Sequence, residues 1–347
     1  MKMKPLLSHQ KNCFDVIRIF AAFLVLYSHH FALSGKMEPS FLGFESFGGL
    51  AVVIFFGVSG YLIAQSGMRS ENFISFMGKR INRIFPALVV CSLILYGIVA
   101  FFLQPDNIFS KRTLVAAINL VALRGADPIS MAQHYIYPNA INGSLWTLPL
   151  EFACYLILGV AFCFVKNIRP ILIVLILMIT LTIYFLSNPT TIGFYSISLE
   201  LFTPRAIAFF FGALMALSEK SWNKTKLKIY FLSGIILLYI LKGSYEIRVL
   251  GYIIVPALII IAGVSLTDRI IYGRFDYSYG VYIYAFPVQQ IIINNTALGF
   301  YSSMLVSAFI TLLLAALSWH TVERRFLRKK SVPAAKPSFS SQELVIK

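Results

Sequence analysis

Ten apolar stretches, each close to the length of a membrane helix, follow one another along this chain of 347 residues. A helix needs about 20 mostly apolar residues to cross the hydrocarbon core, and it satisfies its own backbone hydrogen bonds there. The stretches therefore predict an all-α, polytopic transmembrane bundle of ten helices, of which the sixth and seventh are short. They cover residues 13–33, 46–65, 84–103, 144–165, 170–187, 204–218, 229–242, 249–266, 277–297 and 303–320.

Composition supports this prediction, because 58% of the residues are hydrophobic and only 13% are charged. Soluble domains have about 45–50% apolar and about 25% charged residues, which excludes an ordinary soluble enzyme, a disordered chain and a secreted disulfide scaffold. The first apolar stretch follows a basic N-terminus, but it contains Arg18 and has no small-residue cleavage site. We therefore expect a retained membrane helix there rather than a cleaved signal peptide.

The net charge of +16 comes from 30 Lys and Arg against 14 Asp and Glu, and its distribution predicts the orientation. With the N-terminus and C-terminus inside, 23 of the 30 basic residues fall on inner segments, as the positive-inside rule requires. Because the charge lies in short segments between apolar stretches, nucleic acid is not an expected partner. The predicted inner segments are 1–18, 66–83, 166–169, 219–228, 267–276 and 321–347.

One predicted outer segment, residues 104–143, is long, and long segments in compact proteins are often functional. Its apolar stretch TLVAAINLVALRG predicts a short surface or re-entrant helix. At the other end of the chain, residues 329–347 have a disorder-like composition. We predict one membrane domain over residues 1–328 and a disordered cytoplasmic tail after it, while monomer and homodimer both stay open.

Four ionisable residues fall inside predicted membrane helices, where charged groups are costly and are functional candidates: Arg18, His29, Glu151 and Arg205. Arg18 and His29 are 11 residues apart, so they share one helix face and lie about 16 Å apart along the axis. Glu151 is predicted about 10 Å below the outer end of its helix, where its carboxylate can orient the His29 imidazole. The alternatives are a buried structural pair for these two residues and an interfacial, snorkelling Arg205.

The segment FMGKRINRIFP carries a second candidate site at the predicted inner face. Arg80 and Arg83 are three residues apart, so they share one side of a helix and suit a phosphate or diphosphate ligand. The alternative is topological, because basic residues flank most cytoplasmic helix ends. The histidines show no metal-ligand spacing, so no metal cofactor is predicted.

These residues lie in a series of motifs that resembles the acyltransferase 3 family of integral membrane O-acyltransferases. RIFAAFLVLYSHH gives the R-x10-H pattern of that family with Arg18 and His29, and KRINRIFP resembles its RxxRIxP segment. GSLWTLPLEFACY, with Trp146 and Glu151, is similar to WxLxxExxxY, and TPRAIAFFFGAL, with Arg205, resembles RxxxFxxG. Three further segments, GLAVVIFFGVSGYLIAQ, FDYSYGVYIYAFPV and SWHTVERRFL, are similar to FFxxSGxLI, SYxxYLxHxP and SxxxVExPF.

Each motif is short, but their order, spacing and fit to ten helices over about residues 12–328 make the combination specific. One departure lies in the ninth predicted helix, where many members of the family have a His and this chain has Ala285. No role of that His is carried over to this chain. In the terminal segment Arg325 stands where Pro is common, and no catalytic consequence is expected.

The resemblance implies transfer of an acyl group, most often acetyl, from cytoplasmic acyl-CoA to a sugar hydroxyl. The implied acceptor is a surface polysaccharide, such as an exopolysaccharide or lipopolysaccharide O-antigen, or its lipid-linked precursor, at a bacterial cytoplasmic (inner) membrane. The phosphates of acyl-CoA need cations at the inner face, which Arg80 and Arg83 would supply. Arg18 would extend this positive path toward His29.

His29 is the predicted catalytic residue, either as the base that takes the hydroxyl proton or as a transient acyl carrier. Glu151 is predicted to orient His29 or the acceptor hydroxyl. Arg205 is predicted to hold an anionic acceptor or to stabilise the thioester oxyanion, and Trp146 is either an acceptor-stacking platform or a membrane anchor. Ser59 is interpreted as a helix-packing residue rather than a nucleophile.

The rival function is a secondary transporter or flippase for a glycan-related substrate, in which the intramembrane Arg, His and Glu form a proton relay or substrate path. Against it, the hydropathy shows no internal repeat, and a nucleotide-like ligand explains the RxxR segment better. Release of free CoA that depends on the acceptor separates the two functions, because a transporter should release none.

Overall fold

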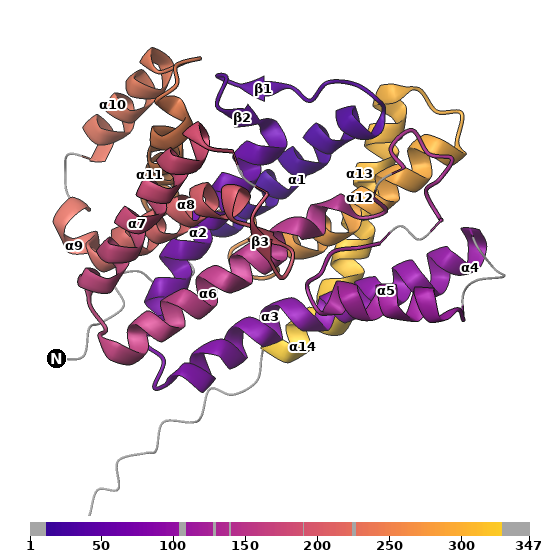
Figure 1. Cartoon of the computed structure of the whole chain (residues 1–347), viewed down its shortest axis with the longest axis horizontal. Helices are drawn as coiled ribbons and strands as arrows, with labels where there is room; N and C mark the ends of the chain where they lie inside the picture. The colour runs from indigo at the N-terminus through magenta and orange to yellow at the C-terminus, as the bar shows by residue number, and fades with distance from the viewer. Residues whose placement is uncertain are drawn as a thin grey trace, which may run out of the picture.

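A computed structural model describes residues 12–103, 109–127, 130–138, 140–189, 191–223 and 227–327. In this part of the chain, helices form a bundle and two short hairpins, β1–β2 and β3–β4, connect some of them (Figure 1). Eight helical segments among the described residues are long and apolar enough to cross a membrane. The prediction of an all-α, polytopic membrane protein is confirmed.

The helices follow the predicted stretches in order along the chain. The long ones are α1 (Phe14–Leu33), α2 (Phe47–Met68), α3 (Phe73–Leu93), α6 (Thr147–Phe164), α7 (Ile168–Ser187), α8 (Leu199–Leu217), α11 (Ile247–Ser265), α12 (Ser278–Asn295) and α13 (Phe300–Ser318). Helix α3 continues through η1 (Ile94–Val99) into α4 (Ala100–Leu103), and α13 continues through η4 (Trp319–Glu323) into α14 (Arg324–Leu327). The shorter elements are β1 (Ser40–Phe41), β2 (Glu45–Ser46), α5 (Lys111–Val121), η3 (Gly143–Trp146), β3 (Gly193–Phe194), β4 (Ile197–Ser198), α9 (Glu219–Trp222) and α10 (Leu227–Ile240).

Two of the ten predicted membrane helices are not among the eight long apolar segments. Helix α10, the seventh prediction, has only 14 residues, as its short apolar stretch indicates. Helix α12, the ninth, is long enough but carries the amide side chains of Gln289, Gln290, Asn294 and Asn295, which lower its hydropathy. The orientation with both termini inside stays a prediction.

The sixth predicted helix is longer than expected, because α8 begins at Leu199 rather than near residue 204. Pro204 lies inside it, close enough to the N-terminal end that few intrahelical hydrogen bonds are lost. The apolar stretch of the long segment 104–143 forms the short helix α5, which packs against α3 (Figure 1). The predicted tail, residues 329–347, lies outside the described residues.

The predicted inner segment 66–83 is mostly helical, in agreement with the shared helix side predicted for Arg80 and Arg83. Helix α2 continues to Met68, and α3 begins at Phe73 after the Asn72 side chain accepts a hydrogen bond from the Ser75 amide at 2.8 Å. The basic side chains here lower the hydropathy of a sequence window without ending the helix, because α3 is amphipathic at this end. Arg80 and Arg83 therefore lie within α3.

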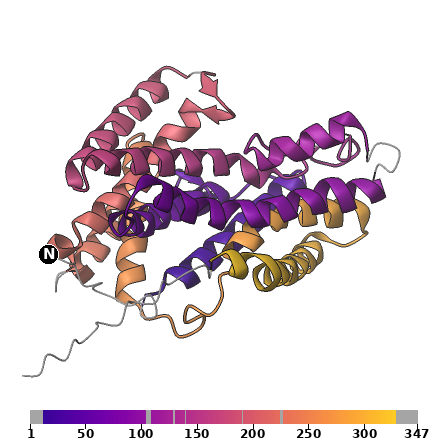
Figure 2. The same ribbon diagram turned by 90° about the horizontal axis from the view of Figure 1, so that it is seen from below.

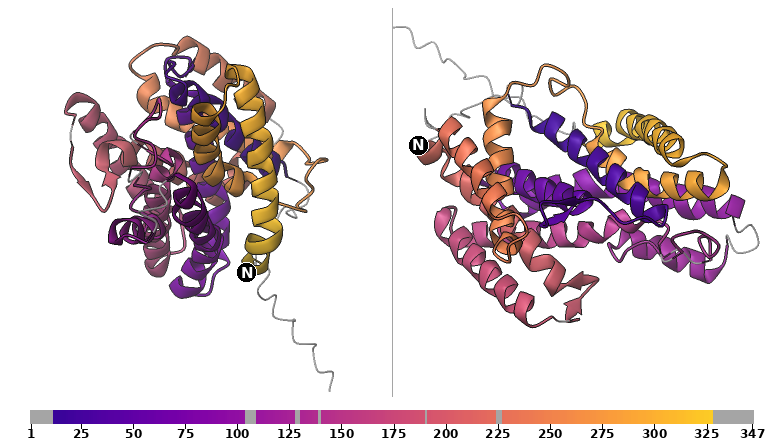
Figure 3. Two further views of the ribbon diagram at one scale, coloured as in Figure 1. Left: turned by 90° about the vertical axis from the view of Figure 1, so that its right-hand side faces the viewer. Right: turned by 90° about the horizontal axis from the view of Figure 1, so that it is seen from above.

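Helix α2 is the centre of the bundle and packs against α1, α6, α8 and α11 (Figures 2 and 3). Its backbone and that of α8 approach so closely that only glycine fits at the crossing. A Cβ atom on Gly60 would lie 1.8 Å from the carbonyl oxygen of Phe209, and one on Gly212 would lie 2.1 Å from that of Gly57. Small residues allow such close approach of membrane helices, where apolar burial alone does not drive association.

Candidate active site

Helices α1, α2, α3, α6 and the start of α12 surround a cavity of about 350 Å³. Its walls include the apolar side chains of Phe55, Phe56 and Leu62 from α2. Four of the seven predicted site residues line it: Arg18, Arg80, Arg83 and Glu151. The structure thus brings the predicted inner cations and the predicted carboxylate to one cavity.

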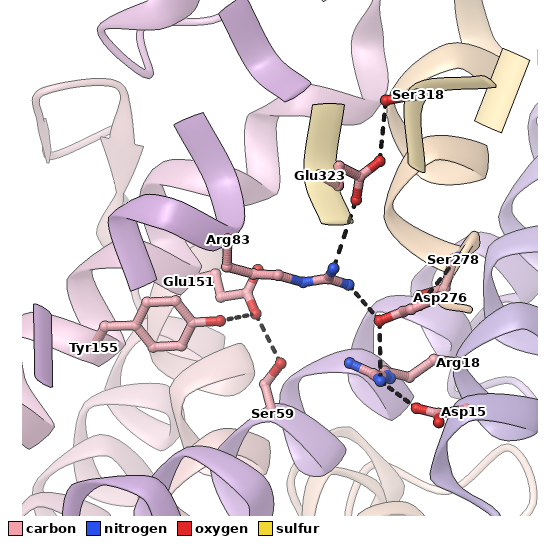
Figure 4. Close-up of polar contacts among 10 residues, drawn as sticks. All are labelled: Asp15, Arg18, Ser59, Arg83, Glu151, Tyr155, Asp276, Ser278, Ser318 and Glu323. Atoms are coloured by element: carbon pink, nitrogen blue, oxygen red, sulfur yellow. Dashed lines mark hydrogen bonds and ion pairs between the residues drawn. The ribbon is translucent and has the colours of Figure 1, made fainter. Parts of the chain in front are cut away.

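Asp276, just before α12, joins an arginine of α1 to an arginine of α3 (Figure 4). Its Oδ2 atom lies 3.1 Å from Nη2 of Arg18 and 2.5 Å from Nη2 of Arg83. Burial alone would raise the pKa of the Asp276 carboxyl, but the two guanidinium groups and the hydrogen bonds from Ser278 hold it well below its usual range. Asp276 is therefore a carboxylate that connects three helices.

The same two arginines meet two further acids. Arg18 Nη2 lies 2.5 Å from Asp15 Oδ1, and Arg83 Nη1 lies 3.5 Å from Oε2 of the buried Glu323 (Figure 4). Ser318 donates a hydrogen bond to the other Glu323 oxygen at 3.0 Å. The guanidinium groups of Arg18 and Arg83 are therefore each paired with acids in this cluster.

Arg80 differs from Arg83 although both belong to the RxxR segment. Its Nη2 donates only a long hydrogen bond, 3.4 Å, to Ser66, and its buried Nε has no partner. Lys79, which also lines the cavity, donates to Ser70 Oγ at 3.0 Å, and Arg69 lies at the same mouth. Among the described residues no carboxylate lies within 4 Å of these three cations, so their charge is available to an anionic ligand.

Glu151 faces the cavity, and no hydrogen bond or ion pair joins it to His29 among the described residues. Its Oε1 accepts hydrogen bonds from Ser59 at 2.7 Å and from Tyr155, one turn away on α6 (Figure 4). Ser144, in η3 directly before α6, is the residue that lies beside His29. Glu151 is about 10 Å farther along the helix axis. Ser59 contacts Glu151 and adjoins the close α2–α8 crossing.

His29 lies one layer beyond the cavity. Its Nδ1 is 3.4 Å from Ser144 Oγ, and its ring packs edge-on against Phe286 at 5.3 Å between centroids. Tyr282, which lines the cavity, donates to the carbonyl oxygen of Ser144 at 2.7 Å and also bonds the Thr147 hydroxyl. A single layer of Thr147 and Tyr282 thus separates the cavity from the residue that contacts His29.

Arg205 and Trp146 lie together in a second cluster away from the cavity lining. The Arg205 guanidinium carbon is 5.5 Å from the Trp146 ring centroid and 5.7 Å from that of Tyr252. Its Nη2 lies 2.9 Å from Glu45 Oε1, which also accepts from the Tyr252 hydroxyl. Arg205 is only 7% exposed, so it does not snorkel to the interface.

Comparison with known proteins identifies the family of this chain. The sequence profile of an acyltransferase domain family, Acyl_transf_3, matches residues 11–321. The chain belongs to the acyltransferase 3 family. It is 46% identical over 329 residues to the O-acetyl transferase of Shigella phage Sf6, covering 93% of this chain and 98% of that relative. It is also 26% identical over 355 residues to Nodulation protein 10 of Rhizobium leguminosarum bv. viciae, covering 93% and 95% respectively.

No solved structure matches the chain. As a member of the acyltransferase 3 family, it is a multi-pass membrane acyltransferase, so the transporter alternative is set aside. The predicted range of the family resemblance, about residues 12–328, agrees with the matched range.

Several residues of this candidate site were not predicted from the sequence. Asp276 lies inside the FDYSY segment, which was interpreted only as part of a family motif. Asp276 is an acid at the end of a predicted basic inner segment and just before a helix, and an acid at such a position can indicate a buried ion pair. Ser144 and Tyr282 carry no such signal in the sequence. Tyr282 contacts Ser144 and Ser144 contacts His29 only because of how α1, η3 and α12 pack together.

Proposed function

We propose that this membrane acyltransferase transfers an acetyl group from cytoplasmic acetyl-CoA to a hydroxyl of a surface polysaccharide or its lipid-linked precursor, in a bacterial inner membrane. One observation carries the proposal. The cavity extends from Arg69, Lys79 and Arg80, which have no carboxylate within 4 Å among the described residues, to the layer of Thr147 and Tyr282 beside His29. A donor with an anionic head and a long neutral arm that ends in a thioester fits this arrangement.

The donor would bind with its phosphates at the mouth. Guanidinium and ammonium groups recognise phosphate through charge-assisted hydrogen bonds, and the unpartnered Nε of Arg80 offers one more donor. The pantetheine arm would lie along the apolar wall that Phe55 and Phe56 provide. Arg18 and Arg83, whose charges are compensated by acids, would shape the mouth rather than supply most of its attraction.

The reaction would take place at the far end of the cavity. His29 would accept the proton of the acceptor hydroxyl while the hydroxyl oxygen attacks the thioester carbonyl carbon. The carbon–sulfur bond then breaks, and the imidazolium returns the proton to the leaving thiolate, so that an acetyl ester and free CoA are formed. In the alternative, the imidazole itself is acetylated first and passes the group to the hydroxyl in a second step.

A single-turnover experiment separates these alternatives. Radiolabelled acetyl-CoA is mixed with the full-length enzyme in the absence of acceptor, and the protein is rapidly denatured at neutral pH. Label on wild-type protein that is absent from the His29→Ala variant supports the carrier. Release of CoA that occurs only when acceptor is present, with no labelled protein, supports the base.

The acceptor would approach from the side of Trp146 and Arg205. An indole face is a stacking surface for a sugar ring, and the buried Nε of Arg205 has no partner among the described residues. The acetyl group is proposed as the acyl group because the relative in Shigella phage Sf6 is named O-acetyl transferase. Glu151, held by Ser59 and Tyr155, would line the path of the thioester.

The test is mass analysis of surface glycans from a deletion strain that carries wild type, His29→Ala or His134→Ala. His134 is an exposed histidine outside the cavity, so it controls for the loss of an imidazole. We expect one added acetyl mass with wild type and His134→Ala and none with His29→Ala at equal protein abundance. Glycans that are chemically identical in all strains contradict the proposed function.

A further inference from the structure

The cavity has a far end, opposite the mouth that Arg69, Lys79 and Arg80 line. Helix α2 shows where this end lies, because a stripe of α2 residues at helical spacing lines the cavity: Val52, Phe55, Phe56, Ser59, Leu62, Ile63 and Ser66. Ser66, which contacts Arg80, and Val52 are 14 residues apart on α2, about 21 Å along the helix axis. Val52 therefore marks the end of the cavity that is far from the cations.

The helices beyond this end are closely packed. On α1 the cavity lining stops at Arg18, and Ala22 and Val25, farther along the helix, are at most 1% exposed and do not line it. On α2 the residue before Val52, Ala51, is fully buried, and so is Ile283 on α12. Within the described residues, the cavity therefore ends inside the helix bundle as a blind end.

Tyr282 of α12 forms the wall of this blind end. Its hydroxyl donates a hydrogen bond to the Ser144 carbonyl oxygen at 2.7 Å and lies 2.5 Å from Oγ1 of Thr147. Its ring packs edge-on against Phe55 of α2, with 5.6 Å between the ring centroids. Because contacts on η3, α6 and α2 hold both the hydroxyl and the ring, the Tyr282 side chain is a fixed wall rather than a mobile one.

We infer that Tyr282 limits the length of the acyl group that this enzyme transfers, because the acyl chain of the donor ends against its ring. This inference rests on the proposed function, in which the thioester lies at this end of the cavity. Val52, Phe55 and Leu148 supply apolar sides to the same end, and such sides suit a short hydrocarbon chain. Tyr282 is thus the residue that selects acetyl over longer acyl groups.

The position of the wall relative to His29 explains why chain length matters. Behind Tyr282, the Ser144 hydroxyl oxygen lies 3.4 Å from Nδ1 of His29, so an acetyl group that ends at the wall holds its thioester close to the histidine. Each added methylene would move the thioester carbonyl back toward the mouth, because the chain has no room beyond the wall. A misfit of one methylene in an apolar pocket changes kcat/KM by about 10- to 200-fold.

The neighbouring tyrosines of α12 do not take this place. Tyr279 also lines the cavity, but it lies one turn closer to the mouth, and its hydroxyl donates to the Ile84 carbonyl oxygen of α3 at 2.9 Å. Tyr284 is only 3% exposed and does not belong to the cavity lining. Tyr284 therefore offers a matched control, a buried tyrosine on the same helix that does not face the donor.

The experiment compares acetyl-CoA, propionyl-CoA and butyryl-CoA as donors for the full-length enzyme in proteoliposomes, with purified lipopolysaccharide as acceptor. Acyl transfer and the release of free CoA are both measured, and kcat/KM is determined for each donor. The variants are Tyr282→Ala, which removes the wall, and Tyr282→Phe, which keeps the ring and removes the hydroxyl. Tyr284→Ala is the control for the loss of a buried tyrosine from α12.

We expect kcat/KM of the wild type to fall by about tenfold or more for each methylene added to acetyl-CoA. Tyr282→Ala should raise the ratio of butyryl to acetyl transfer by about tenfold or more, whereas Tyr282→Phe and Tyr284→Ala should keep the wild-type ratio. A wild-type ratio in Tyr282→Ala overturns the inference, including when all three donors lose rate by one common factor. A wild type that uses butyryl-CoA as well as acetyl-CoA, or an equal change of ratio in Tyr284→Ala, also overturns it.

If Tyr282→Ala does not accumulate in the membrane, Tyr282→Leu decides, because leucine is shorter than tyrosine but still fills part of the packed end. A raised ratio of propionyl to acetyl transfer in this variant supports the inference, and an unchanged ratio overturns it. Failure of the proposed function is recognised separately. In that case the wild-type enzyme itself transfers no acyl group from any of the three donors and releases no CoA, whatever the variants do.

Discussion

Replacing Arg83 with alanine should destabilise the protein far more than the same change at Arg80, although the two residues belong to one motif. Arg83 lies 2.5 Å from Asp276 and 3.5 Å from Glu323, whose side chains are only 12% and 2% exposed. Removing one partner of a buried ion pair leaves an uncompensated charge and costs about 3–5 kcal/mol. Because Asp276 still pairs with Arg18 in this variant, we expect Arg83→Ala to lower the free energy of unfolding by about 3 kcal/mol, the lower end of that range.

For Arg80→Ala the expected loss is smaller, at most about 1 kcal/mol, because the side chain makes one long hydrogen bond, to Ser66. The assay is thermal unfolding of purified protein in detergent. With an unfolding entropy of about 2.1 cal/mol/K per residue, the 347 residues give about 0.7 kcal/mol/K, so 3 kcal/mol lowers Tm by about 4 °C. Helices that persist in detergent reduce this entropy and enlarge the shift.

A second replacement sharpens the test. In Arg83→Ala/Glu323→Gln the orphaned charge is removed with its partner, so part of the lost Tm should return. Arg80→Ala should instead raise KM for acetyl-CoA at nearly unchanged Tm. Equal Tm values for Arg83→Ala and Arg80→Ala, or no recovery in the double variant, refute the reasoning that Arg83 is held by acids and Arg80 is not.

Three further outcomes follow from the structure. Gly60→Ala should lower the free energy of unfolding by about 1–3 kcal/mol through overpacking at the α2–α8 crossing. Gly78→Ala, with nothing within 4 Å of the added Cβ, should leave it unchanged, and equal Tm values for the two variants would contradict this. Ser59→Ala should lower Tm through the lost hydrogen bond to Glu151 yet leave measurable transfer, and complete loss of transfer in well-folded protein would point to a nucleophile. The lowered pKa of Asp276 means that its contribution to stability is complete above about pH 4 and declines as the pH falls below it, so the Tm difference between wild type and Asp276→Asn should narrow only in acid.

Hydropathy alone was enough to predict the membrane fold, because each spanning helix satisfies its own backbone and needs only a local apolar stretch. It was not enough to find where α3 begins. The first turns of that helix carry Lys79, Arg80 and Arg83, and these charges exclude them from the apolar stretch, which begins only at residue 84. The amphipathic pattern of the segment, rather than its mean hydropathy, contained the correct information.

The candidate residues could be predicted from local sequence, but their partners could not, because those depend on how the helices pack. A charged side chain in an apolar stretch is visible in the sequence, which is how Arg18, His29, Glu151 and Arg205 were singled out. Which acid faces which base depends on helix heights that a sequence does not state. One turn of η3 sets Ser144 beside His29 and leaves Glu151 about 10 Å away along the helix axis.

The ion-pair cluster at the cavity mouth also has a consequence for how the protein is made. Arg18 belongs to α1, the first described helix, whereas Glu323 belongs to the last described turns of the chain, which are synthesised later. Until that last helix is inserted, Arg83 lacks one of its acids and the mouth of the cavity is incomplete. A chain that stops before residue 318 would therefore enter the membrane with this ion-pair cluster unfinished.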